Sequence, residues 1–264
     1  MEPVLELRNI VAGYGEGPVL RGLSLSLPPR RIVGLVGESG SGKSTVARVA
    51  AGLLRPESGE VLLNGRALSG RRSKADARRV QMVFQNPEGS LNPKHRIGRT
   101  LSEAMLFHGV ATRADAREKC RALIGRMELP PDTLDRFPRS FSGRQKQRIA
   151  LARALCVGPE LLIADEPTSS LDVSVQLKML DLIRALRAER ELTILFISHD
   201  LGVVRSLCDE VAVMQSGRIV EQGETEAFFS APATDCARRL IDSVPRIRFD
   251  EAAPWLGEAG AEKL

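Results

Sequence analysis

The sequence of 264 residues has no apolar run approaching the roughly 20 residues that a membrane-spanning helix needs. Its first residues, Met1-Glu2-Pro3-Val4, do not have the basic and then apolar layout of a secretion signal. We therefore expect a cytosolic protein that reaches a membrane only through a partner.

Cysteines are few and widely spaced, at Cys120, Cys156, Cys208 and Cys236. None forms a C-x-x-C pair, so the spacing indicates neither a disulfide framework nor a zinc site. Cys156 and Cys208 lie among apolar residues, and we predict that they are core thiols rather than reactive ones.

Aromatic residues are also scarce, since the chain has one tyrosine and one tryptophan. It therefore offers little surface for stacking on single-stranded nucleic acid. The formal net charge is +5, and much of the excess lies in one stretch: Arg66, Arg71, Arg72, Lys74, Arg78 and Arg79. This stretch suits nucleic acid or lipid headgroups, but a solvated loop or helix face is the favoured interpretation. We expect no nucleic-acid substrate.

The most informative segment is glycine-rich and matches the pattern G-x-x-x-x-G-K-[ST]. It consists of Gly37, Glu38, Ser39, Gly40, Ser41, Gly42, Lys43, Ser44 and Thr45. The apolar residues 31–36 predict a buried strand before it, and residues 46–54 predict a helix after it, closed by Arg55-Pro56. A phosphate loop requires this order of strand, loop and helix.

Each part of this loop suits a nucleoside triphosphate. Glycines let successive N–H groups converge on phosphate oxygens, and the helix N-terminus adds positive charge. We expect Lys43 to neutralise the β- and γ-phosphates and Ser44 to ligate Mg2+. The alternative, a glycine-rich turn before an ordinary helix, is disfavoured because every fixed position matches in the right context.

Two carboxylates follow the apolar segment 161–164, namely Asp165 and Glu166. The carboxyl ends of parallel strands carry the ligand sites of α/β sheets. We predict that Asp165 holds Mg2+ through a bridging water, and that Glu166 polarises the water attacking the γ-phosphate. His199 follows another apolar segment and is predicted to hydrogen-bond the γ-phosphate. The alternatives are a solvated acidic turn and a structural histidine.

The remaining pattern predicts an α/β fold. Strands are expected at 4–10, 19–27, 60–68 with a turn at Asn64-Gly65, 80–84, 161–165 and 192–198, and a hairpin at 210–221. Helices are expected at 100–108, 113–127, 142–155 and about 173–190. This order predicts a mostly parallel sheet flanked by helices, with a helical block inserted between its strands.

Six motifs in order give the sequence a close resemblance to ABC-transporter ATP-binding subunits over roughly residues 4–228. They are the phosphate loop, Gln85, Phe141-Ser142-Gly143-Arg144-Gln145, Asp165-Glu166, Ser170-Leu171-Asp172 and His199. The resemblance implies a RecA-like P-loop NTPase core with an antiparallel β subdomain and an inserted α-helical subdomain. It places the nucleotide-binding domain at 1–228, its helical subdomain at about 88–158, and a short C-terminal extension at 229–264.

The same resemblance implies a head-to-tail pair of subunits with two ATP molecules between them. Each ATP would contact one subunit's phosphate loop and the other subunit's signature helix. The signature and neighbouring residues implied to contact ATP are Ser142, Gly143, Gln145 and Asp172. Tyr14 matches the aromatic residue that stacks on adenine. Gln85 matches the residue that touches the metal or the attacking water and links the site to the helical subdomain.

The family's assembly implies several partners. These are a second ATPase subunit, a different chain in our prediction, two transmembrane permease subunits and an extracytoplasmic solute-binding protein. The protein would then lie on the cytoplasmic face of the inner membrane. Residues 84–93 and 166–176 resemble dipeptide, oligopeptide and nickel importers most, which leaves peptides and metal chelates open as the solute.

Two departures from the family pattern stand out. Arg144 replaces the second glycine of the signature, and a long side chain there opposes close approach of phosphate although a guanidinium is itself a strong phosphate partner. We hypothesise that the ATP site completed by this signature is the slower of two. In the tail, Ala231 and Ala233 stand where the family usually has histidine and tyrosine.

Three other functions are disfavoured by the sequence. A soluble ABC ATPase acting on nucleic acid or ribosomes usually has two cassettes or a long coiled-coil insert, and neither is present. An exporter often has the cassette and the permease in one chain, and the motifs flanking Gln85 resemble those of importers instead. A catalytically dead regulatory cassette is disfavoured by the presence of Lys43, Asp165, Glu166 and His199.

Overall fold

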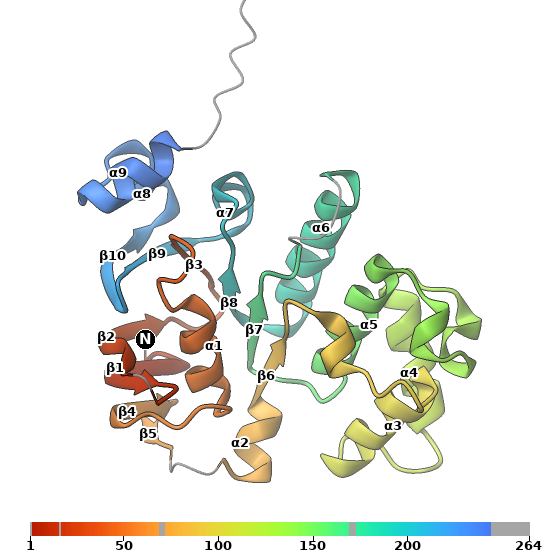
Figure 1. The fold of residues 1–264 in the computed structure, drawn as a ribbon. Helices are drawn as coiled ribbons and strands as arrows, with labels where there is room; N and C mark the ends of the chain where they lie inside the picture. Colours follow the sequence, from red (N-terminus) through yellow and green to blue (C-terminus); the bar gives the residue numbers. More distant parts are fainter. Residues whose placement is uncertain (1, 16, 69–71, 169–172, 244–264) are drawn as a thin grey trace, which may run out of the picture.

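The computed structural model describes residues 2–15, 17–68, 72–168 and 173–243 of the chain. Its centre is a six-stranded sheet in the order β10-β9-β3-β8-β7-β6, in which neighbouring strands from β9 to β6 are parallel and β10 pairs antiparallel with β9 (Figure 1). The strands are β3 (Ile32–Gly37), β6 (Val80–Val83), β7 (Leu161–Asp165), β8 (Thr193–Ile197), β9 (Glu210–Gln215) and β10 (Arg218–Glu224). The predicted parallel sheet and its final hairpin are confirmed.

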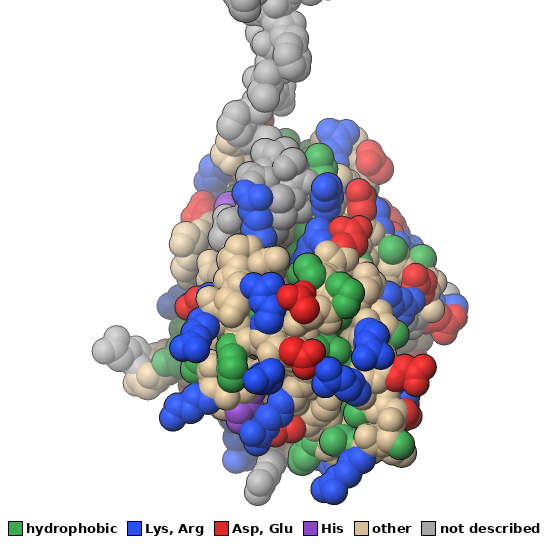
Figure 2. Space-filling view, turned by 90° about the vertical axis from the view of Figure 1, so that its right-hand side faces the viewer, with side chains coloured by type: hydrophobic (Ala, Val, Ile, Leu, Met, Phe, Trp, Pro, Cys, Tyr) green, Lys and Arg blue, Asp and Glu red, His purple; other side chains and the backbone are tan. Residues whose placement is uncertain are grey.

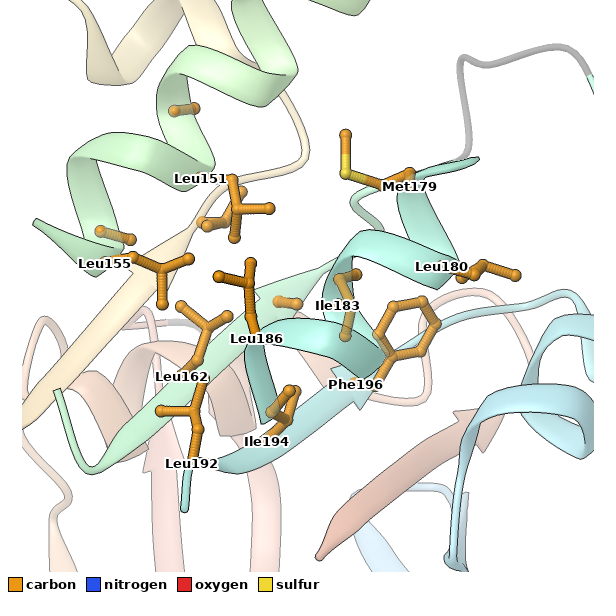
Figure 3. Packing of buried hydrophobic residues seen from close by; sticks show 14 of the residues in the cluster. Leu151, Leu155, Leu162, Met179, Leu180, Ile183, Leu186, Leu192, Ile194 and Phe196 are labelled. Carbon is orange, nitrogen blue, oxygen red and sulfur yellow. The ribbon is translucent and has the colours of Figure 1, made fainter. Parts of the chain in front are cut away.

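Both faces of this sheet are buried, because successive side chains of a strand point to opposite sides. Leu162 and Phe196 belong to one hydrophobic cluster, whereas Ile163 and Leu195 belong to a second. Figure 3 shows the first cluster from close by, with Leu162 and Phe196 facing the helices that cover this side. The near-continuous apolar sequence of the strands is explained by this burial on both faces.

The second cluster lies between the parallel sheet and a four-stranded antiparallel sheet, ordered β2-β1-β4-β5. Its strands are β1 (Leu5–Gly13), β2 (Pro18–Leu27), β4 (Ser58–Leu63) and β5 (Arg66–Ala67). Asn64 and Gly65 both have positive φ, 46° and 70°, as a tight hairpin turn requires. Helix α1 (Lys43–Ala51) packs between the two sheets, in contact with strands of each.

A helical region follows β6 and lies beside that edge of the sheet, with α5 packed against β6 (Figure 1). It consists of η1 (Pro87–Ser90), α3 (Ile97–Phe107), α4 (Ala116–Arg126), η2 (Pro131–Asp135), η3 (Pro138–Ser140) and α5 (Gly143–Leu155). Helix α6 (Val173–Arg190) packs beside α5, and their side chains meet around Leu151, Ile183 and Leu186 (Figure 3). The predicted fold class is confirmed; the domain boundaries at 228, 88 and 158 remain predictions.

Helix boundaries differ from the predictions by a few residues. The helix predicted at 46–54 begins at Lys43 and ends at Ala51, because Gly52 adopts a left-handed conformation (φ 75°) and donates its N–H to carbonyls of the last turn. Helices α3 and α4 begin or end one to three residues away from the predicted bounds. Helices α2 (Lys74–Arg79), α7 (Leu201–Leu207), α8 (Thr225–Ser230) and α9 (Asp235–Asp242) were not predicted.

The basic stretch is only partly solvated. Ser73 caps α2, and the Arg72 guanidinium turns inward to donate to the carbonyls of Val49 and Ala50 at the end of α1. A cation at the C-terminal end of a helix is stabilising. All four cysteines are buried, which confirms the prediction of core thiols at Cys156 and Cys208.

The start of the predicted C-terminal extension is folded. Glu221 on β10 accepts hydrogen bonds from the backbone of Ala233 and from the backbone and hydroxyl of Thr234, which caps α9. These bonds fix the first turn of α9 against β10. Within the described ranges, no helix is both long and apolar enough to cross a membrane.

Candidate functional site

The glycine-rich loop between β3 and α1 is held by backbone contacts that a side chain would obstruct. A Cβ at Gly37, whose φ is 153°, would lie 2.2 Å from the Met214 carbonyl oxygen. The Gly217 N–H donates to the Ser41 carbonyl at 3.1 Å, which braces the loop against the β9–β10 turn. The first glycine of the pattern, Gly37, is therefore required by the close approach of the β9 backbone, in addition to any approach of a phosphate.

Lys43 is 8% exposed and turns into this loop. Its Nζ donates to the carbonyls of Gly37 and Glu38, each at 2.8 Å. Burial lowers the pKa of Lys43, and the carboxylates of Glu166 and Asp165 oppose that shift. The ammonium keeps a third donor, so it is suited to neutralise an anion that enters the loop.

Ser44 and Asp165 meet at the C-terminal end of β7. The Ser44 hydroxyl donates to Asp165 Oδ1 at 3.3 Å. Burial raises the pKa of Asp165 and the nearby Glu166 adds to the rise, while the hydrogen bond from Ser44 opposes it. A hydroxyl beside a carboxylate at a phosphate loop is a donor set that suits Mg2+.

Glu166 is the centre of a second group of contacts. Its φ of 47° is unusual for a non-glycine residue, and its N–H donates to the Ile197 carbonyl at 3.0 Å. Gln85 Nε2 donates to one carboxylate oxygen at 2.9 Å, and His199 Nδ1 lies 3.4 Å from the other. Three side chains predicted separately from the sequence are thus in contact.

These two groups of side chains line one cavity of about 550 Å³. Its walls are Val19, Ser39, Gly40, Gly42, Lys43, Ser44, Thr45, Gln85, Glu166 and His199. The volume lies within the range of ligand pockets, and the polar groups converge on the loop that would hold phosphates. The residues fit a nucleotide whose triphosphate would lie at the start of α1, and Ser44 and Asp165 are the residues that would hold an associated Mg2+.

Tyr14 lies outside the lining of this cavity and is 54% exposed. Arg48 Nη1 donates to the Tyr14 hydroxyl at 2.8 Å, and the guanidinium carbon lies 5.7 Å from the ring centre. Val19 is a wall residue. The sequence analysis missed both Val19 and Arg48, because neither has a local pattern that separates it from an ordinary strand or helix residue.

The signature residues lie at the exposed start of α5, away from α1 (Figure 1). Ser142 caps the helix: its hydroxyl accepts the Gln145 N–H at 3.3 Å, and Gln145 Oε1 accepts the Ser142 N–H at 3.1 Å. Gly143 occupies the first helical position. None of the three lines the cavity that contains Lys43. Asp172, predicted beside them, falls outside the described residues.

A model of the ABC transporter family matches residues 20–169. A protein of Brucella ovis, named for ATP binding in peptide import, is 40% identical over 250 residues, covering 92% of this chain and 79% of its own. The chain belongs to the ABC transporter family. The oligopeptide transport ATP-binding protein OppF of Streptococcus pyogenes serotype M1 is also 40% identical, over 253 residues, covering 92% of this chain and 82% of its own.

Solved structures of ABC transporter proteins share the fold. CbiO1 of Clostridium perfringens, part of the transporter complex cbiONQ, has a TM-score of 0.77 at 26% identity, covering 88% of this chain and 92% of its own. The ATP-binding cassette MJ0796, a dimer bound to ADP and phosphate after hydrolysis, has a TM-score of 0.76 at 26% identity, covering 84% and 98%. The predicted family and fold are confirmed, while the roles of individual residues stay predictions.

Proposed function

We propose that this chain is the ATP-hydrolysing subunit of an importer of peptides. The observation that carries the proposal is the joining of Lys43, Ser44, Gln85, Glu166 and His199 in one cavity. Peptides are favoured over nickel chelates as the solute because the relatives that are 40% identical over nine-tenths of this chain are named for peptide and oligopeptide transport.

The contacts within the cavity support roles for three side chains in hydrolysis. Glu166 accepts the proton of the attacking water, and the left-handed backbone at this residue presents its carboxylate to the cavity. Gln85 and His199 hold the two carboxylate oxygens and fix their direction. Mg2+, when bound, would neutralise charge on the phosphate oxygens; Ser44 and Asp165 are the residues that would hold it.

The signature residues serve a different ATP molecule in this proposal. They lie outside the cavity and at the exposed start of α5, so a second subunit is needed to bring them to a phosphate. MJ0796, which shares this fold, is dimeric with ADP and phosphate bound. We infer a pair of different ATPase subunits, in which Arg144 slows the site that this chain's signature completes.

The other partners are two permease subunits and an extracytoplasmic solute-binding protein, which place the chain on the cytoplasmic face of the inner membrane. A nucleic-acid-directed ATPase is the weaker candidate. Figure 2 shows Lys and Arg side chains interspersed with Asp and Glu on the face presented by the helical region. Phosphate backbones favour a continuous basic surface instead.

Peptide uptake by reconstituted vesicles tests the proposal. The vesicles contain this chain with its sister ATPase and permease subunits, ATP inside and the solute-binding protein with labelled peptide outside. We expect ATP-dependent uptake that Glu166→Gln abolishes and Glu191→Gln leaves intact. Glu191 is the control because it forms an exposed ion pair with Arg30 and does not line the cavity. ATP hydrolysis that nucleic acid stimulates and the permease leaves unchanged would contradict the proposal.

A further inference from the structure

One buried side chain on the signature helix has no hydrogen-bond partner. Gln147 on α5 is 2% exposed, and neither its Oε1 nor its Nε2 contacts a partner in the described part of the chain. Such groups are rare, because the large majority of buried side-chain polar atoms are hydrogen-bonded. A buried amide without partners is also less stable than an apolar side chain of similar size.

The position of Gln147 connects it with the cavity described above. Helix α5 packs against β6 and η1, the two elements on either side of Gln85. The preceding residue, Lys146, forms an ion pair with Glu88 of η1. Gln147 therefore follows directly, on the helix that contacts both neighbours of Gln85, a side chain that reaches η1.

The helix gives this amide no structural reason to be polar. Ala150, Leu151 and Ala154 follow at helical spacing of three, four and seven residues, and all three are buried. Leu151 points into the apolar cluster between α5, α6 and the sheet (Figure 3). Methionine or leucine at 147 would continue this apolar stripe.

We propose that Gln147 is a positioning residue whose carboxamide hydrogen-bonds the backbone around Gln85 when ATP is bound. The inference rests on the proposed function and adds that ATP binding shifts the protein from one arrangement to a second. The missing bonds make the nucleotide-free arrangement less stable, and forming them favours the arrangement with ATP. Gln147 thereby couples two parts of this chain: the signature helix, which would contact one ATP, and Gln85, which would contact the other.

Thermal unfolding of the full chain with Gln147→Met gives the first test. Without nucleotide, we expect the midpoint to rise by about 2–4 °C, as removal of one unsatisfied amide predicts. With Mg2+ and a non-hydrolysable ATP analogue, we expect a smaller ligand-induced rise than in the wild type. A lower midpoint in both conditions would overturn the proposal, because it would show that the amide is satisfied without nucleotide.

Thr133→Val is the matched control. Thr133 is 0% exposed in η2, its Oγ1 also has no partner among the described residues, and η2 packs on α3 and α4 away from Gln85. We expect this variant to raise the midpoint equally with and without nucleotide. An equal loss of the nucleotide-induced shift in both variants would overturn a specific role for Gln147.

Steady-state kinetics and hydrogen exchange of the assembled transporter give the second test. We expect Gln147→Met to lower kcat and to raise the KM for ATP, so that kcat/KM falls roughly tenfold, the equivalent of one lost hydrogen bond. Nucleotide-induced protection of the backbone amides at 84–86 should be lost as well. Wild-type kcat and protection in this variant would overturn the inference, whereas an inactive wild-type complex would contradict the proposed function instead.

Discussion

Two helix starts of this molecule are built in opposite ways. Helix α1 has Gly42 as its N-cap residue and no side-chain cap, and its loop is braced by distant residues such as Gly217. Helix α5 begins at Ser142 with a reciprocal cap between Ser142 and Gln145, entirely from local sequence. Both helix N-termini favour an anion through their dipole, but among the described residues only the first is enclosed by the chain's own side chains.

The difference between the two helix starts indicates which half of an ATP site each of them supplies. At α1, Lys43, Gln85, Glu166 and His199 approach from different elements and complete a cavity. At α5, the cap stabilises the helix without any ligand, and the exposed surface needs a second molecule to become a site. In the proposed function, the start of α1 is the catalytic half of one ATP site, and the start of α5 is the complementary half of another.

Breaking the catalytic end should give the largest effect. Glu166→Gln removes the proposed proton acceptor while keeping the shape of the side chain, so we expect the ATPase rate of the assembled transporter to fall by about 10²–10⁴-fold at this site. ATP binding should persist. A phosphate-release assay with a parallel ATP titration checks both, and a rate within twofold of the wild type would contradict the assignment of Glu166.

Removal of the predicted adenine contact, Tyr14, should give a smaller effect. Tyr14→Ala removes the ring that Arg48 holds, and we expect ATP affinity to weaken roughly three- to tenfold. Tyr14→Phe keeps the ring and loses only the hydrogen bond from Arg48, so its affinity should stay near the wild-type value. Titration calorimetry distinguishes them, and equal losses in both variants would argue for the hydroxyl rather than the ring.

A substitution at the start of α5 should raise the ATPase rate instead of lowering it. Arg144→Gly restores close approach of the partner's phosphate, and we expect the ATPase rate of the assembled transporter to rise roughly two- to fivefold. Arg139→Gly, which changes a nearby arginine that stacks on Phe137, is a control for the loss of positive charge. An unchanged rate in the Arg144 variant would count against slowing by this side chain.

The smallest effect concerns the stability of the folded chain and the carboxylate of Asp165, the residue predicted to hold Mg2+. Burial raises the pKa of Asp165 in the folded protein, so the ionised carboxylate destabilises the nucleotide-free chain above that pKa. Asp165→Asn should therefore raise the unfolding midpoint by about 2–4 °C at neutral pH. The difference should vanish below the unfolded-state pKa of about 3.9, where the wild type is also neutral. Thermal scans across pH check the sign.

Much of the catalytic end could be predicted from sequence because its parts carry local patterns. The glycine loop, the acidic pair after β7 and His199 after β8 each follow an apolar strand, and strands of a parallel sheet end at one edge. The fold class followed from the same alternation of strands and helices. The hairpin turn at Asn64-Gly65 was equally predictable, since both residues favour positive φ.

The misses depend on contacts between residues far apart in the chain. Arg48 holds Tyr14 across 34 positions, and Arg72 caps α1 from a stretch that looked fully solvated. Gln147 looks like an ordinary helix residue until its burial is known. Such features depend on tertiary packing, and neither hydrophobic period nor residue type reveals them.

ATP affinity of the isolated, monomeric chain tests the central claim most directly, with Lys43→Ala and Gly143→Asp measured side by side. A Cβ at Gly143 meets nothing within 4 Å, and an acid in the first turn of α5 is compatible with the helix, so this variant should fold. We predict that Lys43→Ala abolishes binding while Gly143→Asp stays within about twofold of the wild type, because the signature contributes nothing to the chain's own cavity. Comparable loss of affinity in both variants would contradict the assignment of the two helix starts to different ATP molecules.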